Sequence, residues 1–505
     1  MNLIELLERN ARKFAGKDAV RAAGKAVTFA GLLEEARRAA AVLQSWGVRK
    51  GDRVAIMSHN TLAFPIAYHG AILAGAAVVP VNHKLAPAEV GYILDHSEAR
   101  VFLFDGALAA VARSVQTRAR EASLDSAAPG VERFEDALPG APTFAPVDVG
   151  DDDVAEILYT SGTTGKPKGC LHPHRNVIAA AITGALAVKL DESDRVLVAM
   201  PLWHSSPLNN WFMGAQYVGA TTVLLREYHP LHFLQAIQDE RCTVYFGAPI
   251  SYILPLQMIP TFDQFDLRSM RAWIYGGGPI GADTARMLAQ RYRSDRFYQV
   301  YGMTETGPTG TVLLPAEQVA KAGSIGRTAL PGADLVVMRT EREEARPGET
   351  GEIWLRADSM MKGYFKDPEA SARAFTRGWY RTGDVARVDA DGYLFIVDRI
   401  KDMISVGGEN VYSKVVEEAL AGHPGVAQVA VVGKPHPEWG ETVVAFVVPA
   451  KGATLTEDGL QGFLADKLAR YEIPREVRFV ESLPLTPTGK LMKFKLREQL
   501  AQQRQ

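Results

Sequence analysis

Cysteine is scarce in this sequence. Two cysteines, Cys170 and Cys242, occur among 505 residues, and neither stands in a CxxC or metal-ligand spacing. We therefore expect neither a disulfide framework nor a zinc site, and a reducing cytoplasm is the expected location.

An excess of one charge sign is also missing. The chain has 56 Lys and Arg against 58 Asp and Glu, so its formal net charge is -2. This balance gives no support for a nucleic-acid partner or for binding to a strongly acidic membrane. An anionic ligand must then be held by a few local groups.

Long hydrophobic runs are absent as well. The most apolar segment, residues 71–82, is interrupted by Gly75 and Pro80 and is too short to cross a bilayer, so no transmembrane segment is expected. It predicts the end of a helix followed by a buried strand. Residues 1–14 lack the apolar core and cleavage site of a signal peptide and predict an amphipathic surface helix.

The chain does contain a regular alternation of helical and β-branched segments. Its length and its 47% of hydrophobic residues require at least two domains. Helical patterns at residues 29–47 and 230–241 lie among the expected strands, so the fold class is α/β with mostly parallel sheets. The expected strands are residues 53–58, 77–82, 100–105, 156–161, 195–200, 221–225 and 242–248.

The second half of the chain changes character twice. Short strands dominate from about residue 325 to 398 and predict a β-rich subdomain. After residue 398, two helical and three strand patterns predict a compact α+β domain of ordinary size. We expect an N-terminal domain of residues 1–398 and a small, mobile C-terminal domain of residues 399–505.

The loop "YTSGTTGKPKG", residues 159–169, follows one of the apolar strands. Its glycines allow several backbone N–H groups to face one anion, and its hydroxyls and lysines add donors and charge. The Walker A spacing is not met, because Pro167 stands where Ser or Thr would follow the lysine. For an isolated loop of this kind, a solvated turn is the commoner interpretation.

Eight further motifs follow this loop in a fixed order: "PLWHSS", "YGGGPI", "YGMTETG", "GEIWLR", "WYRTGD", "DRIKDMI", "GGENVY" and "PLTPTGK". Together they resemble the adenylate-forming superfamily, which includes acyl-CoA synthetases, luciferases and peptide-synthetase adenylation domains. The resemblance covers essentially the whole chain. It implies an enzyme that uses ATP and Mg²⁺ to adenylate a carboxylic acid.

The resemblance assigns nucleotide contacts to four of the motifs. The loop would clamp the β- and γ-phosphates of ATP, Tyr301 would pack on adenine, Thr304 would contact the α-phosphate and Glu305 would bind Mg²⁺. Asp384, assisted by Arg399, would accept the ribose hydroxyls. The remaining residues with an implied binding role are Thr160, Ser161, Gly162, Thr163, Thr164, Gly165, Lys168, Gly277, Gly278, Pro279 and Gly302.

The resemblance also implies a change of domain orientation between two half-reactions. Lys490 would stabilise the negative charge that develops when the carboxylate attacks the α-phosphate. Lys401 occupies the hinge position, about which the C-terminal domain would turn before the thiol attacks. Gly407 and Gly408 would then line the passage for the pantetheine arm of coenzyme A, although Val406 replaces the serine found in many relatives.

Two aromatic positions concern the acyl group and the thiol. His204 resembles the residue that gates the acyl pocket, and Trp203 stands where relatives often carry Phe. Trp439 matches a position where some aryl-CoA ligases stack the adenine of CoA; burial against the C-terminal core is an equally reasonable role for a single tryptophan.

Three hypotheses for the function remain at this point. The first is a CoA ligase that forms acyl-AMP and then acyl-CoA. The second is an adenylating enzyme that loads a carrier protein, or a luciferase-like oxidase; the third is a nucleotide-binding protein without catalysis. The motifs "DRIKDMI", "GGENVY" and "EWGE" favour the first.

The acid itself is predicted from residues 203–217 and 246–253, the expected specificity segments. Both are rich in aromatic and apolar residues and contain no Lys or Arg, so a second carboxylate on the substrate has no evident partner. A medium- or long-chain fatty acid is favoured, with an aromatic acid such as a cinnamate or benzoate as the alternative. The oligomeric state is left open, with a homodimer as one possibility.

Overall fold

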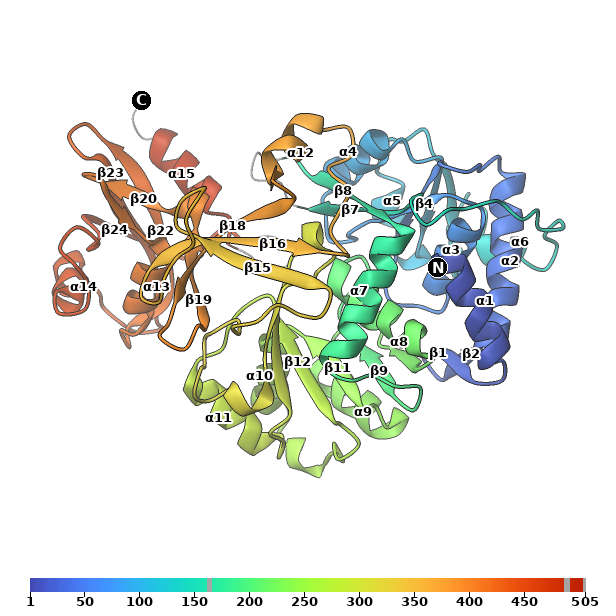
Figure 1. The fold of residues 1–505 in the computed structure, drawn as a ribbon, viewed down its shortest axis with the longest axis horizontal. Coiled ribbons are helices and arrows are strands. Elements are labelled where there is room, and N and C mark those ends of the chain that lie inside the picture. Colours follow the sequence, from blue (N-terminus) through green and yellow to red (C-terminus); the bar gives the residue numbers. More distant parts are fainter. Residues whose placement is uncertain (161–165, 486–490, 503–505) are drawn as a thin grey trace. The chain divides into compact units, whose positions relative to one another are not determined.

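The computed structural model describes residues 1–160, 166–485 and 491–502 (Figure 1). Two units are distinguished by their internal packing: residues 1–335 with 355–380, and residues 336–354 with 381–505. This division reports packing within the chain, so the predicted hinge boundary at residues 398 and 399 stays a prediction.

A six-stranded sheet of the described residues carries the N-terminal half of the first unit. Its order is β6-β5-β3-β4-β7-β8, and every pairing is parallel except that of β7 with β8. Its strands are buried on both faces, as in α/β proteins. The strands are β3 (Arg53–Met57), β4 (Ala77–Pro80), β5 (Val101–Phe104), β6 (Arg120–Ser123), β7 (Val154–Thr160) and β8 (Lys168–Pro173).

An eight-stranded sheet of the described residues follows, in the order β14-β13-β12-β11-β9-β10-β1-β2. It is parallel in the middle, and its end pairs β13–β14 and β1–β2 are antiparallel. Its strands are β1 (Asp18–Ala22), β2 (Lys25–Thr28), β9 (Arg195–Val198), β10 (Thr221–Leu224), β11 (Val244–Gly247), β12 (Ala272–Gly276), β13 (Phe297–Tyr301) and β14 (Thr311–Leu313). All seven strands expected from the sequence are confirmed.

Helices of the first unit share one hydrophobic core with both sheets. That core joins Val54 and Ile56 of β3 with Val196 and Val198 of β9, and it buries faces of α2, α3 and α7. Helices α1, α2 and α3 pack side by side (Figure 1). The helices are α1 (Leu3–Lys13), α2 (Phe29–Ser45), α3 (Ala63–Leu73), α4 (Pro87–Ser97), α5 (Ala109–Ala112), α6 (Phe134–Ala137), α7 (His174–Ala187), α8 (Met213–Val218), α9 (Pro230–Glu240), α10 (Ile250–Met258), α11 (Ala282–Arg291) and α12 (Pro368–Ala374).

A five-stranded sheet of the described residues occupies the segment that was expected to be β-rich. Its order is β15-β16-β18-β17, with β19 paired to β18, and β15, β16 and β18 each pass from one unit into the other. The strands are β15 (Ala333–Met338), β16 (Thr350–Ala357), β17 (Phe375–Thr376), β18 (Trp379–Val388) and β19 (Leu394–Arg399).

The rest of the second unit has the predicted α+β composition. Its sheet, again counted over the described residues, has the order β21-β20-β23-β22 with β24 paired to β23. The elements are β20 (Ile404–Val406), β21 (Glu409–Val411), α13 (Ser413–Ala421), β22 (Val426–His436), β23 (Gly440–Pro449), α14 (Glu457–Leu464), β24 (Glu476–Phe479) and α15 (Lys493–Gln502). At the end of helix α14 the Lys467 ammonium donates to the Phe463 carbonyl at 2.8 Å.

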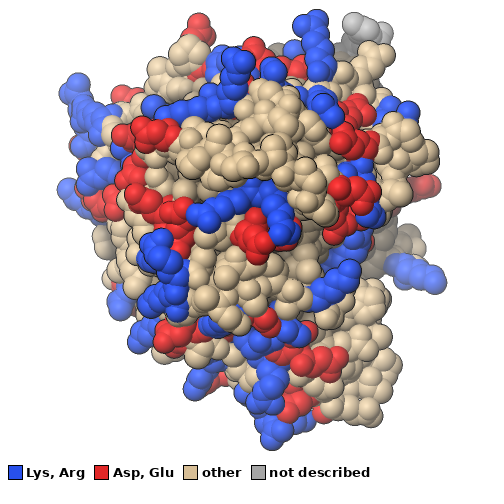
Figure 2. Space-filling model, turned by 90° about the vertical axis from the view of Figure 1, so that its right-hand side faces the viewer, with Lys and Arg blue, Asp and Glu red and all other residues tan. Residues whose placement is uncertain are grey.

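Charges of both signs are mixed on the face of the first unit that Figure 2 presents. On α2, Arg38 pairs with Glu34 and Glu35, and Arg37 pairs with Glu8 of α1. This surface agrees with the balanced composition. Among the described residues, none of the helices has both the length and the apolar character needed to cross a membrane, and the cytoplasmic location stays a prediction.

Candidate active site

The predicted phosphate loop closes an antiparallel hairpin. Thr160 ends β7, Lys168 begins β8, and the two residues are directly paired across the strands. Helix α7 starts only at His174, so the loop does not lead directly into a helix as a Walker A loop does. Of the other residues predicted in this loop, Ser161, Gly162, Thr163, Thr164 and Gly165 lie outside the described residues.

The "YGMTETG" motif lies at the carboxyl end of β13. Tyr301 is the last residue of that strand, and Thr304 and Glu305 form a short 3-10 turn after Gly302. Gly307 ends the turn with φ +64°, and a Cβ atom there would meet the Ser359 carbonyl oxygen at 2.2 Å. Glycine is therefore required at this position, and it fixes how the turn presents Glu305.

Glu305 and Lys168 share a tyrosine that sequence reasoning missed. The Tyr364 hydroxyl donates to Glu305 Oε1 at 3.1 Å, and Lys168 Nζ lies 5.1 Å from the Tyr364 ring centroid. Burial raises the pKa of Tyr364, and the Glu305 charge adds to this, so the hydroxyl keeps its proton. Tyr364 stands in "MKGYF", a stretch without any pattern typical of a site.

A small apolar cluster lies beside this tyrosine. Cys170, Met361 and Tyr380 are buried together there, with Tyr364 packed against them. Burial raises the pKa of the Cys170 thiol, and the Glu305 carboxylate raises it further, so this cysteine stays protonated and unreactive. The cluster lies close enough to Glu305 to be affected by its charge, and the Tyr364 hydrogen bond orients this carboxylate, an oxygen ligand of the type that suits Mg²⁺.

Thr304 is also joined to the predicted acyl gate. Its hydroxyl lies 3.0 Å from the Ser205 hydroxyl, next to His204. The rings of His204 and Trp203 are 3.9 Å apart, and Trp203 Nε1 donates to His83 Nδ1 at 3.2 Å. The structure thus brings the predicted α-phosphate contact and the predicted gate together.

A π-helix, Ser206–Phe212, follows the gate. π-Helical segments are frequent at functional sites. Within the expected specificity segments, the Trp211 and Phe246 rings stack with their centroids 5.4 Å apart. No sequence pattern marks the π-helix, because its apolar residues fit an ordinary helix equally well.

The "YGGGPI" motif begins at the end of β12. The Tyr275 hydroxyl donates to Gln318 Oε1 at 2.6 Å, which anchors the strand end. Gly277 has φ +81°, and a Cβ atom on Gly277 or Gly278 would meet no atom within 4 Å. Open space beside these glycines and Pro279 fits the expected close approach of a ligand to the backbone.

The second unit holds the predicted ribose acceptor. Asp384 and Arg399 are opposite each other on β18 and β19, and Arg399 Nε lies 2.9 Å from Asp384 Oδ1. The Asp384 side chain is nearly buried, while Arg399 is half exposed. The guanidinium therefore holds the carboxylate in one orientation.

Lys401, the predicted hinge residue, follows on a 3-10 turn, Ile400–Asp402. Burial lowers the pKa of its ammonium. Lys490, the predicted catalytic lysine, lies outside the described residues.

Three other predicted residues of the second unit meet at the β20–β21 hairpin. Gly407 and Gly408 form its two-residue turn with φ +61° and +92°, values that only glycine adopts easily. The Gly407 N–H donates to the Trp439 carbonyl at 2.8 Å. The Trp439 ring stacks on His436, and the Arg475 guanidinium lies 3.1 Å from its centroid. Its stacking on CoA stays a prediction.

Comparison with known proteins gives a consistent result. The model of the AMP-binding enzyme family matches residues 7–365, and that of the AMP-binding enzyme C-terminal domain matches residues 415–490. A feruloyl-CoA synthase of Amycolatopsis sp is 38% identical over 97% of both chains. The long-chain-fatty-acid–CoA ligase FadD13 of Mycobacterium tuberculosis is 36% identical over 94% of this chain and 93% of its own.

Solved structures extend the likeness to three dimensions. The O-succinylbenzoate coenzyme A synthetase MenE of Bacillus subtilis, in complex with ATP and magnesium ion, superposes with a TM-score of 0.85 at 29% identity, over 98% of this chain and 99% of its own. The chain belongs to the AMP-binding enzyme family and is an acid–thiol ligase of the acyl-CoA synthetase branch of the adenylate-forming superfamily.

Proposed function

We propose that this enzyme activates a hydrophobic carboxylic acid with MgATP and transfers the acyl group to coenzyme A. The observation that carries the proposal is the connected set of Lys168, Tyr364, Glu305, Thr304 and Ser205 beside the aromatic gate. This set supplies a phosphate-binding cation, a metal-binding carboxylate and a hydroxyl at the entrance of an aromatic segment.

The first half-reaction forms acyl-AMP. The substrate carboxylate attacks the α-phosphorus of ATP, the bond to the bridging oxygen breaks, and pyrophosphate leaves. Mg²⁺ held by Glu305 would neutralise phosphate charge. Thr304 would donate to the α-phosphate, Lys168 would bind the departing phosphates, and Lys490 would stabilise the charge at the reacting phosphorus.

The second half-reaction forms the thioester. The CoA sulfur attacks the acyl carbonyl, the thiol proton is lost and AMP leaves. Asp384, oriented by Arg399, would bind the ribose, and residues 407–408 would admit the pantetheine arm. Rotation of the C-terminal domain about Lys401 would move Lys490 away from the reacting groups and bring residues 407–408 to them.

For the acid we propose a medium- or long-chain fatty acid. The stacked Trp211 and Phe246 rings and the absence of Lys and Arg from residues 203–217 and 246–253 support an apolar tail. An aromatic acid is the second candidate, favoured by the likeness to feruloyl-CoA synthase.

A carboxylic-acid panel with CoA, followed by AMP release, tests the function. Fatty acids of increasing length, cinnamates, benzoates and dicarboxylic acids would be compared by kcat/KM. We expect AMP release to require CoA and to be fastest with an aliphatic monocarboxylic acid. AMP release without CoA, or no activation of any acid, would contradict the ligase proposal.

Lys490→Ala tests whether this lysine acts only in the first half-reaction. We expect it to abolish pyrophosphate release while largely sparing thioester formation from supplied acyl-AMP. Lys495→Ala, which alters an exposed lysine on α15, is the matched control. Equal loss of both half-reactions in Lys490→Ala would contradict the proposed domain movement.

A further inference from the structure

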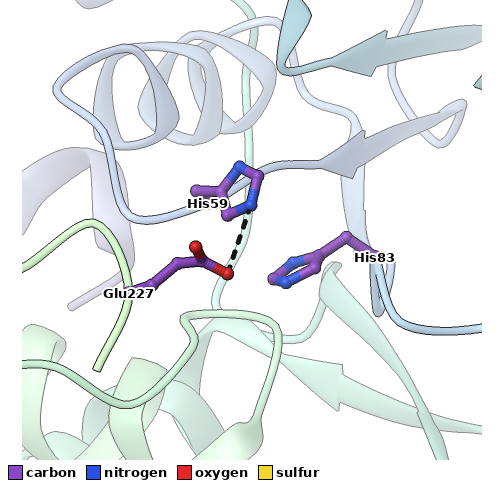
Figure 3. Close-up of side chains that lie close together, drawn as sticks. All are labelled: His59, His83 and Glu227. Carbon is purple, nitrogen blue, oxygen red and sulfur yellow. Dashed lines mark ion pairs between the residues drawn. The ribbon is translucent and has the colours of Figure 1, made fainter. Parts of the chain in front are cut away.

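Three metal-ligating side chains converge in the first unit, beside the Trp203–His204 gate. His59, His83 and Glu227 follow the carboxyl ends of the parallel strands β3, β4 and β10. One ligand atom of each lies within 4.8 Å of the others, and Figure 3 shows the two imidazoles and the carboxylate facing a common point. The phosphate-transfer chemistry described above assigns no role to these residues.

His59 is oriented by a buried carboxylate. Its Nδ1 lies 2.6 Å from Oδ2 of Asp105, whose side chain is 0% exposed and also pairs with Arg226 at 2.6 Å. The Ala107 N–H donates to the other carboxylate oxygen of Asp105 at 3.0 Å. An ionised carboxylate can only accept, so His59 carries its proton on Nδ1. In the neutral imidazole this leaves the Nε2 lone pair available, the arrangement found in carboxylate–histidine–metal sites.

The available nitrogen faces an anion. His59 Nε2 lies 3.5 Å from Oε1 of Glu227. When His59 is neutral, its lone pair and this carboxylate oxygen repel each other unless a cation lies between them; a proton on Nε2 or a bound metal ion can be that cation. In a tetrahedral shell with metal–ligand distances of about 2.0–2.1 Å, two ligands are roughly 3.4 Å apart, which is close to the observed separation.

His83 is the third potential metal ligand, and one of its ring nitrogens lacks a hydrogen-bond partner among the described residues. Its Nδ1 accepts from the Trp203 indole, while its buried Nε2 has no hydrogen-bond partner among the residues that the structure describes. The backbone of Ser58 lies close enough to the His83 ring to act on its pKa, which burial lowers to about 4. A buried imidazole nitrogen without a partner is costly, and coordination of a cation would satisfy it.

We propose that His59, His83 and Glu227 bind a divalent transition cation of the Zn²⁺ type, with water as the fourth ligand. Imidazole ligands favour Zn²⁺, Co²⁺ or Ni²⁺ over Mg²⁺, which separates this site from that of the nucleotide metal. The anionic Asp105 and Glu227 offset the nearby cations Arg226 and Lys84. The Glu227 side chain is 60% exposed, which gives the cation an entry path and room for the carboxylate to close on it.

Occupancy of this site changes the environment of the acyl gate. Coordination through Nε2 moves the His83 proton to Nδ1, and coordination through Nδ1 displaces the indole directly. Either way the Trp203–His83 hydrogen bond breaks. Because Trp203 stacks on His204 at 3.9 Å, metal binding and the position of the gate are coupled.

The test is titration of the chelator-treated, full-length protein with Zn²⁺ and Co²⁺ in the absence of nucleotide. We expect one Co²⁺ per chain with the absorption of a four-coordinate site, displaced by Zn²⁺ and unaffected by excess Mg²⁺. Tryptophan fluorescence should change in parallel, and Trp203→Phe should remove this change while retaining the Co²⁺ absorption.

Two ligand variants and one control decide the assignment. Glu227→Gln, at an exposed position, and His83→Ala should each weaken Co²⁺ binding tenfold or more. His232→Ala is the control, since it alters an exposed histidine whose ring lies 4.7 Å from His229 and could bind metal adventitiously. Absence of Co²⁺ binding, or a loss of affinity in His232→Ala instead of in Glu227→Gln and His83→Ala, would overturn the proposal.

Discussion

Two buried glutamates, one in each unit, are stabilised in opposite ways. Glu156 on β7 is 0% exposed, and its oxygens accept from the Tyr68 hydroxyl at 2.5 Å and from Asn209 Nδ2 at 2.9 Å. Burial raises its pKa to about 7, although both neutral donors act against this. The group therefore approaches neutrality under ordinary conditions.

Glu417 on α13 is held by a cation. Lys493 Nζ of α15 lies 2.8 Å from Glu417 Oε1 and donates to the Ser413 hydroxyl at 2.6 Å. The same hydroxyl donates to Asp398 at 2.8 Å. Burial raises the pKa of Glu417, and the Lys493 charge acts against this rise.

The two glutamates differ in the groups that hold them, so different substitutions should destabilise the two units. In the group of Glu156, Tyr68 and Asn209, which joins β7 to the π-helix beside the predicted acyl gate, only neutral donors hold the buried carboxyl group. The charged group of Asp398, Ser413, Glu417 and Lys493 joins α15 to the end of β19, next to the predicted hinge. Its integrity depends on an ammonium.

Removing that ammonium should give the largest effect. Lys493→Ala leaves Glu417 buried without its cation, which we expect to cost about 3 kcal/mol of the unfolding free energy of the second unit. Hydrogen exchange of α13 and α15 measures it, with Lys495→Ala as the exposed control on the same helix. Equal protection from hydrogen exchange in both variants would mean that the Lys493–Glu417 ion pair contributes nothing to the stability of the second unit.

The second prediction concerns pH. Glu156 has a folded-state pKa above its unfolded value of about 4.5, so its stabilising contribution is complete below pH 4.5 and is lost as the pH rises through about 7. Between pH 5.5 and 8 this amounts to at most about 2 kcal/mol. Denaturant unfolding of the first unit across this range measures the slope.

Glu156→Gln should remove most of this slope, because the amide keeps the shape of the side chain without ionising. Glu135→Gln, at an exposed position, should leave the slope unchanged. If Glu156→Gln retained the slope of the unaltered protein, the titrating group would have to be another one.

The smallest effect is expected at the hinge itself. Arg497 of α15 lies 2.8 Å from Asp402 Oδ1 and donates to the Lys401 carbonyl at 3.3 Å. Its side chain is 33% exposed, so we expect Arg497→Ala to cost under about 1 kcal/mol. The informative measurement is faster amide exchange confined to residues 400–403. Glu498→Ala is the control. Identical amide exchange in both variants would show that Arg497 does not restrain residues 400–403.

The order of strands and helices followed from local patterns. β-branched runs such as residues 195–200 and the amphipathic segment 230–241 became β9 and α9, because burial of apolar side chains at a fixed period selects the element. The motifs Thr304–Glu305 and Asp384–Arg399 were found for a different reason, since resemblance to a family carries over residues at fixed places in the chain. Their binding roles stay predictions.

Contacts between distant segments could not be predicted in this way. Tyr364 reaches Glu305 from 59 residues away, and Trp203 donates to His83 across 120 residues. A lone tyrosine or histidine has no periodicity or spacing that marks it. The convergence of His59, His83 and Glu227 is of the same kind, because it exists only once the two sheets are packed around a common core.

The sequence by itself determined the α/β class, the strand positions and the family, because each depends on residues close together in the chain or on motifs in a fixed order. The tertiary structure decided which groups share a proton, an ion pair or a ligand site. Glu156 and Glu417 illustrate the reason: the same side chain becomes nearly neutral or ion-paired according to what the fold places beside it.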